Sequence, residues 1–132
     1  MPCIAVKVLQ ADGSTDSVCV NAATLALVDA GVAMKDMVCA CTAADLGRAS
    51  GEGSAAIIDI SRLEHLCNMV TLTLLPKSGK IVQFESTGRL HQDRLRDLLQ
   101  AATEGCHELH SILETAVQEH IKKLASSIES SG

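Results

Sequence analysis

The stretch MVTLTLLPKSGKIVQFE, which runs from Met69 to Glu85, decides the fold class. Its two ends, 69–75 and 80–85, are rich in aliphatic and β-branched residues, which is typical of strands. Between them stands the run Pro76-Lys77-Ser78-Gly79, and Pro and Gly in a short polar connection favour a reversal of the chain. The stretch therefore predicts a β-hairpin.

Downstream of the hairpin, one long helical pattern extends from about Leu90 to Ile128. Gly105 weakens the pattern, so a kink or a break at this residue is an open alternative. The polar tail from Ser126 to Gly132 is expected to fray, and we assign residues 1–128 to one domain and 129–132 to a disordered tail. The apolar residues of the pattern recur at amphipathic helical spacing, at Leu95, Leu98, Leu99, Ala102, Cys106, Leu109, Ile112, Leu113, Ala116, Val117 and Leu124.

Upstream of the hairpin, three shorter segments have the composition of strands. They are Ile4 to Leu9, Met37 to Thr42 and Ala55 to Ile60. In the second segment Cys39 and Cys41 share a face, because side chains repeat every two residues along a strand. A glycine-containing loop, 47–54, precedes the third segment, and a helical turn around 62–66 is expected after it.

A helix is predicted between the first two of these segments. Thr15 or Ser17 can cap it, and Gly31 ends it after Ala30, because glycine tolerates the left-handed conformation beyond a helix end. Its apolar residues at helical spacing are Val18, Ala22, Leu25 and Val28. The order of elements predicts an α+β domain in which a mixed sheet packs with two main helices.

Composition excludes several kinds of ligand site. The 132 residues suffice for one core but not for two domains of ordinary size. The chain has no Trp or Tyr and a single Phe, Phe84, which excludes base-stacking platforms and aromatic cages for cations. A net charge of −5 argues against a domain that binds a phosphate backbone on its own.

The sequence indicates neither a membrane protein nor a secreted one. No stretch approaches the roughly 20 apolar residues that span a bilayer, and the N-terminus lacks the pattern of a signal peptide. Most cysteines lie in apolar runs, where a thiol behaves as a small buried hydrophobe. We therefore expect reduced core thiols and an intracellular compartment for the six cysteines, Cys3, Cys19, Cys39, Cys41, Cys67 and Cys106.

Cysteine and histidine patterns offer weak candidates for chemistry. Cys106 and His110 stand four residues apart, with His107 between them, but a structural zinc needs four ligands and no second cluster has zinc-finger spacing. Cys39 and Cys41 lie mid-strand, not at a helix N-terminus that would lower the pKa of a thiol. We predict no metal site and no cofactor.

The turn before the first helix is a stronger candidate. Gly13, Ser14 and Thr15 open the helix where backbone N–H groups and the positive end of the helix dipole suit an anion such as phosphate. Asp16 places a negative charge at the same position, which repels phosphate and stabilises the helix N-terminus. These residues favour an ordinary capped turn over a phosphate site.

Acid–base catalysis or Mg²⁺ binding would need carboxylates that meet in one cleft. Asp59 and Glu64 flank the polar stretch after the predicted strand 55–60, but the segment 65–69 contains no acid. An acid-dependent site at this place is therefore incomplete.

Two blocks resemble a known family. The run CVNAATLALVDAGVAM, from Cys19 to Met34, and the segment Val8 to Ser14 resemble the hallmark of RNase PH-like proteins. Within that superfamily, MVCAC from Met37 to Cys41 and the run Gly88 to His91 resemble a ring subunit of the eukaryotic RNA exosome. The resemblance covers nearly the whole chain.

The resemblance implies the RNase PH-like fold, which is like domain 2 of ribosomal protein S5. It also implies that this chain corresponds to the C-terminal part of that domain, and that the family's basic RNA-contacting half lies outside it. One apolar face would then lack its usual cover. We expect the isolated chain to be oligomeric or poorly soluble.

The same resemblance implies a damaged phosphate site. Phosphorolytic members carry a turn like Gly-Gly-Thr-Arg whose Thr and Arg hold the attacking phosphate. Gly13 and Thr15 match this turn, whereas Asp16 stands where the Arg is expected. An anion in place of a cation reverses the sign of the interaction with phosphate.

The acid site is damaged as well. Active members have Glu-Asp and then a further Asp shortly before the next strand. Glu64 matches the Glu, but His65 takes the place of the first Asp, and Met69 or alternatively Asn68 takes the place of the second. None of these three residues is a carboxylate.

These departures predict a non-catalytic structural subunit of the exosome core ring, which supports 3′-to-5′ RNA processing and degradation. The resemblance implies partnership with other RNase PH-like ring subunits, with cap subunits and with RNA in the assembled channel, and location in nucleus, nucleolus and cytoplasm. One alternative is an active phosphorolytic 3′-to-5′ exoribonuclease that uses Thr15. Another is a stand-alone domain that has lost the exosome role.

Overall fold

The computed structural model describes residues 2–45, 56–59 and 67–131 of the chain. Within them, two helices and four strands follow one another in the order α1, β1, β2, β3, β4, α2. The predicted loop 47–54 and the predicted helical turn around 62–66 lie outside the described residues. The elements span Thr15–Asp29 (α1), Cys39–Asp45 (β1), Ala56–Ile58 (β2), Asn68–Leu75 (β3), Lys80–Thr87 (β4) and Gln92–Ser130 (α2).

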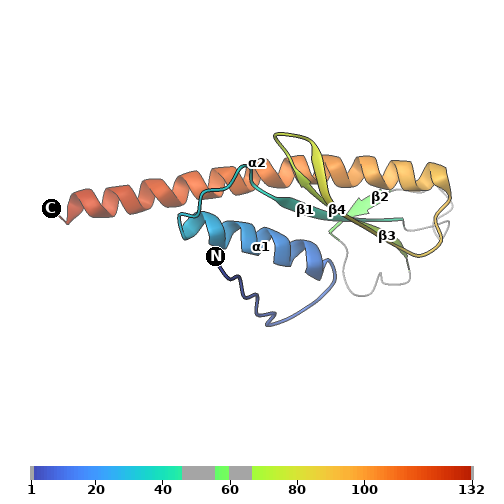
Figure 1. Ribbon diagram of the computed structural model, residues 1–132, viewed down its shortest axis with the longest axis horizontal. Helices are drawn as coiled ribbons and strands as arrows, with labels where there is room; N and C mark the ends of the chain where they lie inside the picture. The colour runs from blue at the N-terminus through green and yellow to red at the C-terminus, as the bar shows by residue number, and fades with distance from the viewer. Residues whose placement is uncertain (1, 46–55, 60–66, 132) are drawn as a thin grey trace.

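The strands form one sheet in the order β2-β1-β3-β4 (Figure 1). The predicted hairpin is confirmed: β3 and β4 are joined by a tight turn in which the backbone N–H of Gly79 donates to the carbonyl of Leu75 at 2.8 Å. Every pairing between the described strands is antiparallel, so the predicted mixed sheet is wrong. The reason is that β2 and β3 both run opposite to β1 but lie on its two sides, so no two parallel strands become neighbours.

The predicted strand from Ile4 to Leu9 is also wrong. Residues 2–12 form neither helix nor strand, and their apolar side chains are largely exposed, with Leu9 at 87%. Alternating apolar residues fit a strand only when a neighbouring strand accepts their backbone hydrogen bonds. Here α1, not a strand, lies beside this segment, and the two enclose a shallow groove.

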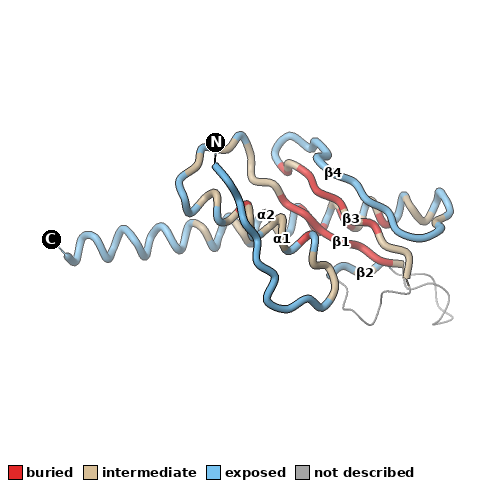
Figure 2. The backbone as a smooth tube through the Cα atoms, turned by 60° about the horizontal axis from the view of Figure 1, so that its bottom comes forward, coloured by how far each residue is buried: buried red, intermediate tan, exposed pale blue. Residues whose placement is uncertain are grey.

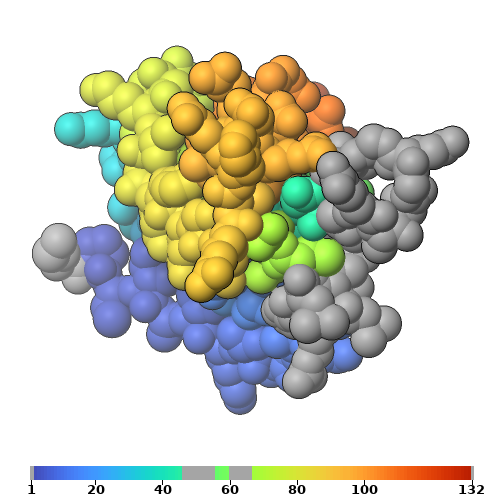
Figure 3. Space-filling view, turned by 90° about the vertical axis from the view of Figure 1, so that its right-hand side faces the viewer, coloured from blue at the N-terminus to red at the C-terminus, as the bar shows by residue number. Residues whose placement is uncertain are grey.

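The two helices lie on opposite faces of the sheet. The core cluster on one face joins Cys39 and Cys41 of β1, which share a face as predicted, to Leu98 and Cys106 of α2. On the other face the Ser17 hydroxyl of α1 lies 3.1 Å from that of Thr42. Figure 2 shows β1 and β3 buried between these layers, whereas β4 at the sheet edge is exposed along its whole length. In Figure 3 the hairpin and the start of α2 lie together above the blue N-terminal part of the chain.

Helix α1 packs on the sheet with a polar face, contrary to the predicted apolar one. Its buried residues are Ser17 and Thr24, whereas Val18 is 57% exposed. The reason is that this helix meets backbone groups at the start of β1, and its polar side chains satisfy them. Asn21 donates from Nδ2 to the Ala40 carbonyl at 2.9 Å and accepts from the Ala40 N–H at 2.8 Å.

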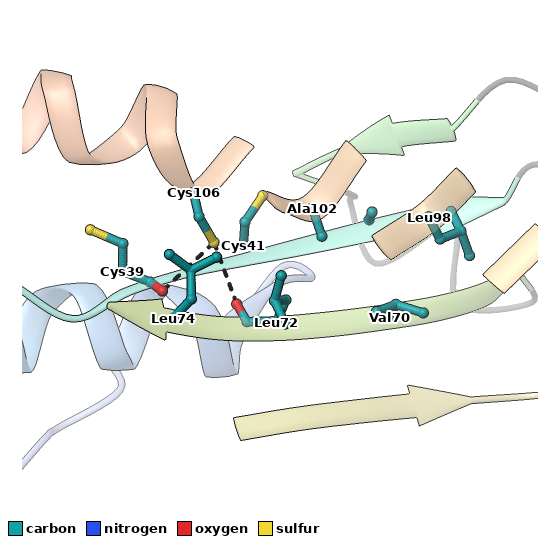
Figure 4. Close-up of a cluster of buried hydrophobic side chains, with 9 residues drawn as sticks. Cys39, Cys41, Val70, Leu72, Leu74, Leu98, Ala102 and Cys106 are labelled. Atoms are coloured by element: carbon teal, nitrogen blue, oxygen red, sulfur yellow. Dashed lines mark hydrogen bonds between the residues drawn. The ribbon is translucent and has the colours of Figure 1, made fainter. Parts of the chain in front are cut away.

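The core between α2 and the sheet combines a few aliphatic side chains with cysteines and alanines. Cys106 of α2 donates its thiol toward the carbonyls of Cys39 and Leu72, each at 3.6 Å (Figure 4). Burial raises the pKa of Cys39 and of Cys41 to about 11 and that of Cys106 to about 12. These three thiols therefore stay protonated near neutral pH, and their burial agrees with the expectation that they belong to the core. Cys3, by contrast, is exposed.

Helix α2 is continuous from Gln92 to Ser130, so the alternative of a break at Gly105 is wrong. Gly105 instead permits close packing: a Cβ at this position would lie 2.7 Å from the Cys41 Sγ and 3.3 Å from the Ile58 Cγ2. The helix also extends past the predicted end at Ile128. No described helix is long and apolar enough to cross a membrane.

Gly105→Ala is expected to lower the free energy of unfolding by about 0.5–2 kcal/mol, because overpacking outweighs the gain in helix propensity. Urea unfolding followed by circular dichroism measures the change. Ser111→Ala, on the exposed side of the same helix, receives a similar propensity gain without a clash. If Gly105→Ala is as stable as Ser111→Ala, close packing does not explain this glycine.

Candidate functional site

The turn that opens α1 has the backbone geometry of a tight reversal. Gly13 and Ser14 both have positive φ angles, 83° and 47°. Ser14 is the N-cap residue, and its carbonyl accepts from the Val18 N–H at 3.1 Å and from the Ser17 hydroxyl at 2.9 Å. The sequence had suggested Thr15 or Ser17 as the N-cap residue. Neither residue takes that position, because the helix begins immediately after Ser14.

The four residues of the predicted phosphate turn lie together. Gly13, Ser14, Thr15 and Asp16 form one wall of a depression whose opposite wall comes from Thr42 of β1 and from Met69 and Thr71 of β3. Sequence reasoning missed this opposite wall, because its residues stand far apart along the chain. The available signal is the cross-strand register, which pairs Thr42 directly with Thr71.

Hydroxyl groups form a connected row beneath this depression. The oxygen of Thr42 lies 3.1 Å from that of Ser17 and 3.0 Å from that of Thr71. Because these hydroxyls already bond to one another, they hold α1 against the central strands. These contacts between α1 and the sheet suffice to fix the position of the turn from Gly13 to Asp16, so no ligand is needed to explain it.

Asp59 directly follows β2 and lies beside Thr42 of β1. It has a positive φ of 60°, and its backbone N–H donates to the Thr42 carbonyl at 3.2 Å. Together with Ser14, Cys41 and Glu108 of α2, it lines a second depression adjoining the first. Glu64, the other predicted acid, lies outside the described residues. Glu108 was not predicted, since its place opposite the end of β2 depends on how α2 docks.

The charges around both depressions are unfavourable for an anion. Asp16 contributes a carboxylate to the first, and Asp59 and Glu108 contribute two to the second. Among the described residues that line either depression there is no Lys or Arg. The dipole at the start of α1 favours an anion by about 0.3–1 kcal/mol, which nearby carboxylates offset.

The cysteine and histidine candidates do not converge. The Cys106 thiol points into the core, whereas His107 on the same helix is exposed. No group of three or more potential metal ligands occurs among residues 2–45, 56–59 and 67–131. Cys39 and Cys41 are buried between the sheet and α2, where their raised pKa values disfavour the thiolate that a nucleophile requires.

The chain is similar in sequence to known exosome components. It is 42% identical to the mouse exosome complex component RRP41 over 127 residues, which are 95% of this chain and 49% of that protein. This chain is homologous to the RRP41 exosome components. It is also 43% identical to the human RRP41 over 122 residues, or 91% of this chain and 47% of the relative.

The similarity to RRP41 extends beyond animals. The exosome complex component Rrp41 of the archaeon Thermococcus kodakarensis is 30% identical over 126 residues, which are 94% of this chain and 48% of that protein. The chain thus spans about half the length of these RRP41 relatives. No protein-family profile matches it. The predicted resemblance to an exosome subunit is confirmed by these relatives.

Proposed function

We propose that this chain acts as a non-catalytic structural part of an exosome core ring, with an RNase PH-like fold. The homology to exosome components named RRP41 supports the assignment to that complex. The four-stranded antiparallel sheet between two helices is compatible with such a fold. In this role the chain supports 3′-to-5′ RNA processing and degradation, including ribosomal RNA maturation and mRNA decay.

The observation that carries the non-catalytic assignment is the position of Asp16. It lies in the same depression as Gly13 and Thr15, where the family's phosphorolytic members are expected to hold phosphate with an arginine. A carboxylate at this place repels the attacking phosphate instead of orienting it. The adjoining depression adds Asp59 and Glu108 and, among its described lining residues, no cation.

The proposal includes the partners and locations of an exosome ring. The partners are other RNase PH-like ring subunits and cap subunits, with RNA passing through the assembled channel. Nucleus, nucleolus and cytoplasm are the proposed locations. Retention of the tagged chain with ring subunits during purification tests the partnership, and a chain that purifies alone would instead be a stand-alone domain.

Asp16→Arg is expected to strengthen binding of inorganic phosphate by about 10-fold or more, because it exchanges a repelled charge for an attracted one at the helix N-terminus. Isothermal titration or phosphate-induced NMR shifts measure the change. Glu119→Arg makes the same charge change at an exposed position of α2 and serves as control. Equal responses of the two variants would show that net charge, not the turn, decides phosphate binding.

Catalysis is tested in the assembled ring. With millimolar phosphate and RNA, the proposal predicts no release of nucleoside diphosphates that depends on this chain. If release occurs and is lost in a Thr15→Ala variant, the chain is an active phosphorolytic 3′-to-5′ exoribonuclease and the structural role is wrong. Intact ring assembly with Thr15→Ala, checked by gel filtration, distinguishes lost chemistry from lost assembly.

A further inference from the structure

A strand covers only part of the outer edge of β1. β2 pairs with the last three residues of β1, Ala43 to Asp45, and the backbone N–H of Asp59 adds one more bond to the Thr42 carbonyl. Among the described strands, none pairs with this edge between Val38 and Cys41. Ala40 in the middle of this stretch is fully buried, so its backbone groups need partners within the protein.

Side chains of α1, which lies beside this part of β1 (Figure 1), supply those partners. Asn21 donates to the Ala40 carbonyl at 2.9 Å and accepts from the Ala40 N–H at 2.8 Å, as an opposite residue in an antiparallel ladder does. The Thr24 hydroxyl, one turn further along, lies 2.9 Å from the Val38 carbonyl. Asn21 and Thr24 thus take the place of a neighbouring strand.

The helix can follow the strand because the two advance at comparable rates over this short distance. Ser17 contacts Thr42 in the middle of β1. Thr24 contacts Val38, just before the strand begins. Between these two contacts the helix advances about 10 Å and the strand about 13 Å, a difference that side chains bridge. The helix and the strand therefore run antiparallel, with each turn of α1 opposite a different point of the edge.

The stretch that α1 covers has the composition of a strand that pairs readily with other chains. The run MVCACTAA, from Met37 to Ala44, contains no charged residue, no Pro and no Gly. The two terminal strands of the sheet differ from it. β2 has three residues, and β4 carries Lys80 and Glu85 and pairs with a register shift. Short length, charge and irregular pairing all oppose the addition of a strand, and β1 has none of them in this run.

We propose that α1 protects the edge of β1 from strand addition: Asn21 and Thr24 occupy the backbone groups to which a strand of another chain would bond. When α1 detaches, residues 38–41 become an open edge, and they pair with the same segment of other copies. The core around Leu98 and Cys106 lies on the opposite face of the sheet, so it does not have to unfold for this opening. The protection is a property of the chain itself and does not depend on the proposed role in the exosome.

Aggregation kinetics test the proposal. Asn21→Ala is expected to shorten the lag before aggregation by about 10-fold or more relative to Leu98→Ala, because the loss of two hydrogen bonds raises the population of the opened state. Leu98→Ala is the matched control, since it removes a fully buried side chain on the other face and leaves the contacts of α1 in place. Thioflavin T fluorescence in reducing buffer measures the lag, infrared spectra measure the strand content of the aggregates, and urea unfolding compares the stabilities of the variants.

A second substitution separates an open edge from a general loss of stability. Val38 lies next to the proposed edge and is half-buried, so a lysine there reaches solvent. In the Asn21→Ala background, Val38→Lys is expected to lengthen the lag by about 10-fold or more, because it places like charges against each other when identical strands pair. Urea unfolding is expected to show no gain in stability from this lysine.

Equal lag times for Asn21→Ala and Leu98→Ala, at equal stability, would overturn the proposal, because unfolding of the whole chain would then decide aggregation. A double variant that aggregates as fast as Asn21→Ala would overturn it as well. If Asn21→Ala does not fold, Asn21→Asp replaces it in both comparisons. This variant keeps the acceptor for the Ala40 N–H and loses the donor to the Ala40 carbonyl, so the same order of lag times is expected.

Discussion

Replacing Leu72 with alanine is expected to lower the free energy of unfolding by about 2–5 kcal/mol. Leu72 is fully buried in the middle of β3, between Cys41 of β1 and Phe84 of β4 in the sheet register. Its removal leaves a cavity directly beneath Cys106 of α2, whose thiol bonds toward the Leu72 carbonyl (Figure 4). The backbone of a central strand cannot move to fill that cavity.

The loss is severe because this core has few large side chains. Most of its buried apolar residues are alanines and cysteines, and the large aliphatic ones among the described residues are Val70, Leu72, Leu74 and Leu98. Domains are stable by only about 5–15 kcal/mol, so the variant loses a large share of the total. We expect part of it to be unfolded at physiological temperature.

Urea unfolding at a protein concentration low enough to avoid association measures this change. Leu9→Ala is the matched control, since it makes the same chemical change at a side chain that is 87% exposed. The control is expected to change stability by about 0.5 kcal/mol or less. If Leu72→Ala is as stable as Leu9→Ala, Leu72 does not lie in a tightly packed core.

Local sequence signals predicted the hairpin and α2 correctly. The hairpin depends on a four-residue turn, Pro76 to Gly79, whose residue types specify the reversal by themselves. Helix α2 depends on a stripe repeated over many turns, from Leu95 to Leu124, so its existence does not depend on any single contact. The hairpin and α2 can therefore be predicted from their own residues alone.

The errors arose where an element depends on its neighbours. The segment from Ile4 to Leu9 has the alternation of a strand, but a strand needs a partner, and none of the described strands pairs with it. The face of α1 was mispredicted because hydrophobic periodicity detects only apolar contacts. Ser17, Asn21 and Thr24 pack by hydrogen bonds, which such periodicity cannot reveal.

The candidate site likewise combines residues that the local sequence identifies with residues that only the tertiary structure brings to it. Gly13 to Asp16 could be identified because they are consecutive and precede a helix. Thr42, Thr71 and Glu108 join them only through sheet register and helix docking, which the sequence does not encode locally. The negative charge of the site was nevertheless predictable, because Asp16 is one of these consecutive residues.

Asn21→Ala is expected to lower the free energy of unfolding by about 2–4 kcal/mol, because it leaves two backbone groups without partners. The Asn21 amide donates to the Ala40 carbonyl at 2.9 Å and accepts from the Ala40 N–H at 2.8 Å. Ala40 is fully buried within the sheet, so water cannot replace either bond without opening the contact between α1 and β1.

The neighbouring contacts cannot take over this role. Thr24 bonds to the Val38 carbonyl at 2.9 Å, just before β1 begins, and Ser17 bonds to the side chain of Thr42. Each of them therefore holds a different point along the strand. Without Asn21, the edge of α1 loses its central attachment, and amide exchange at the Ala40 N–H is expected to accelerate most.

Ala26→Ser, on the exposed side of the same helix, is the control and is expected to cost about 0.5 kcal/mol. Urea unfolding gives the stabilities, and hydrogen exchange at Ala40 reports the local contact. If Asn21→Ala matches the control in both measurements, the paired bonds do not hold the helix. The expected result would instead give a physical reason for Asn21 in the resemblance block, because this residue fastens α1 to β1.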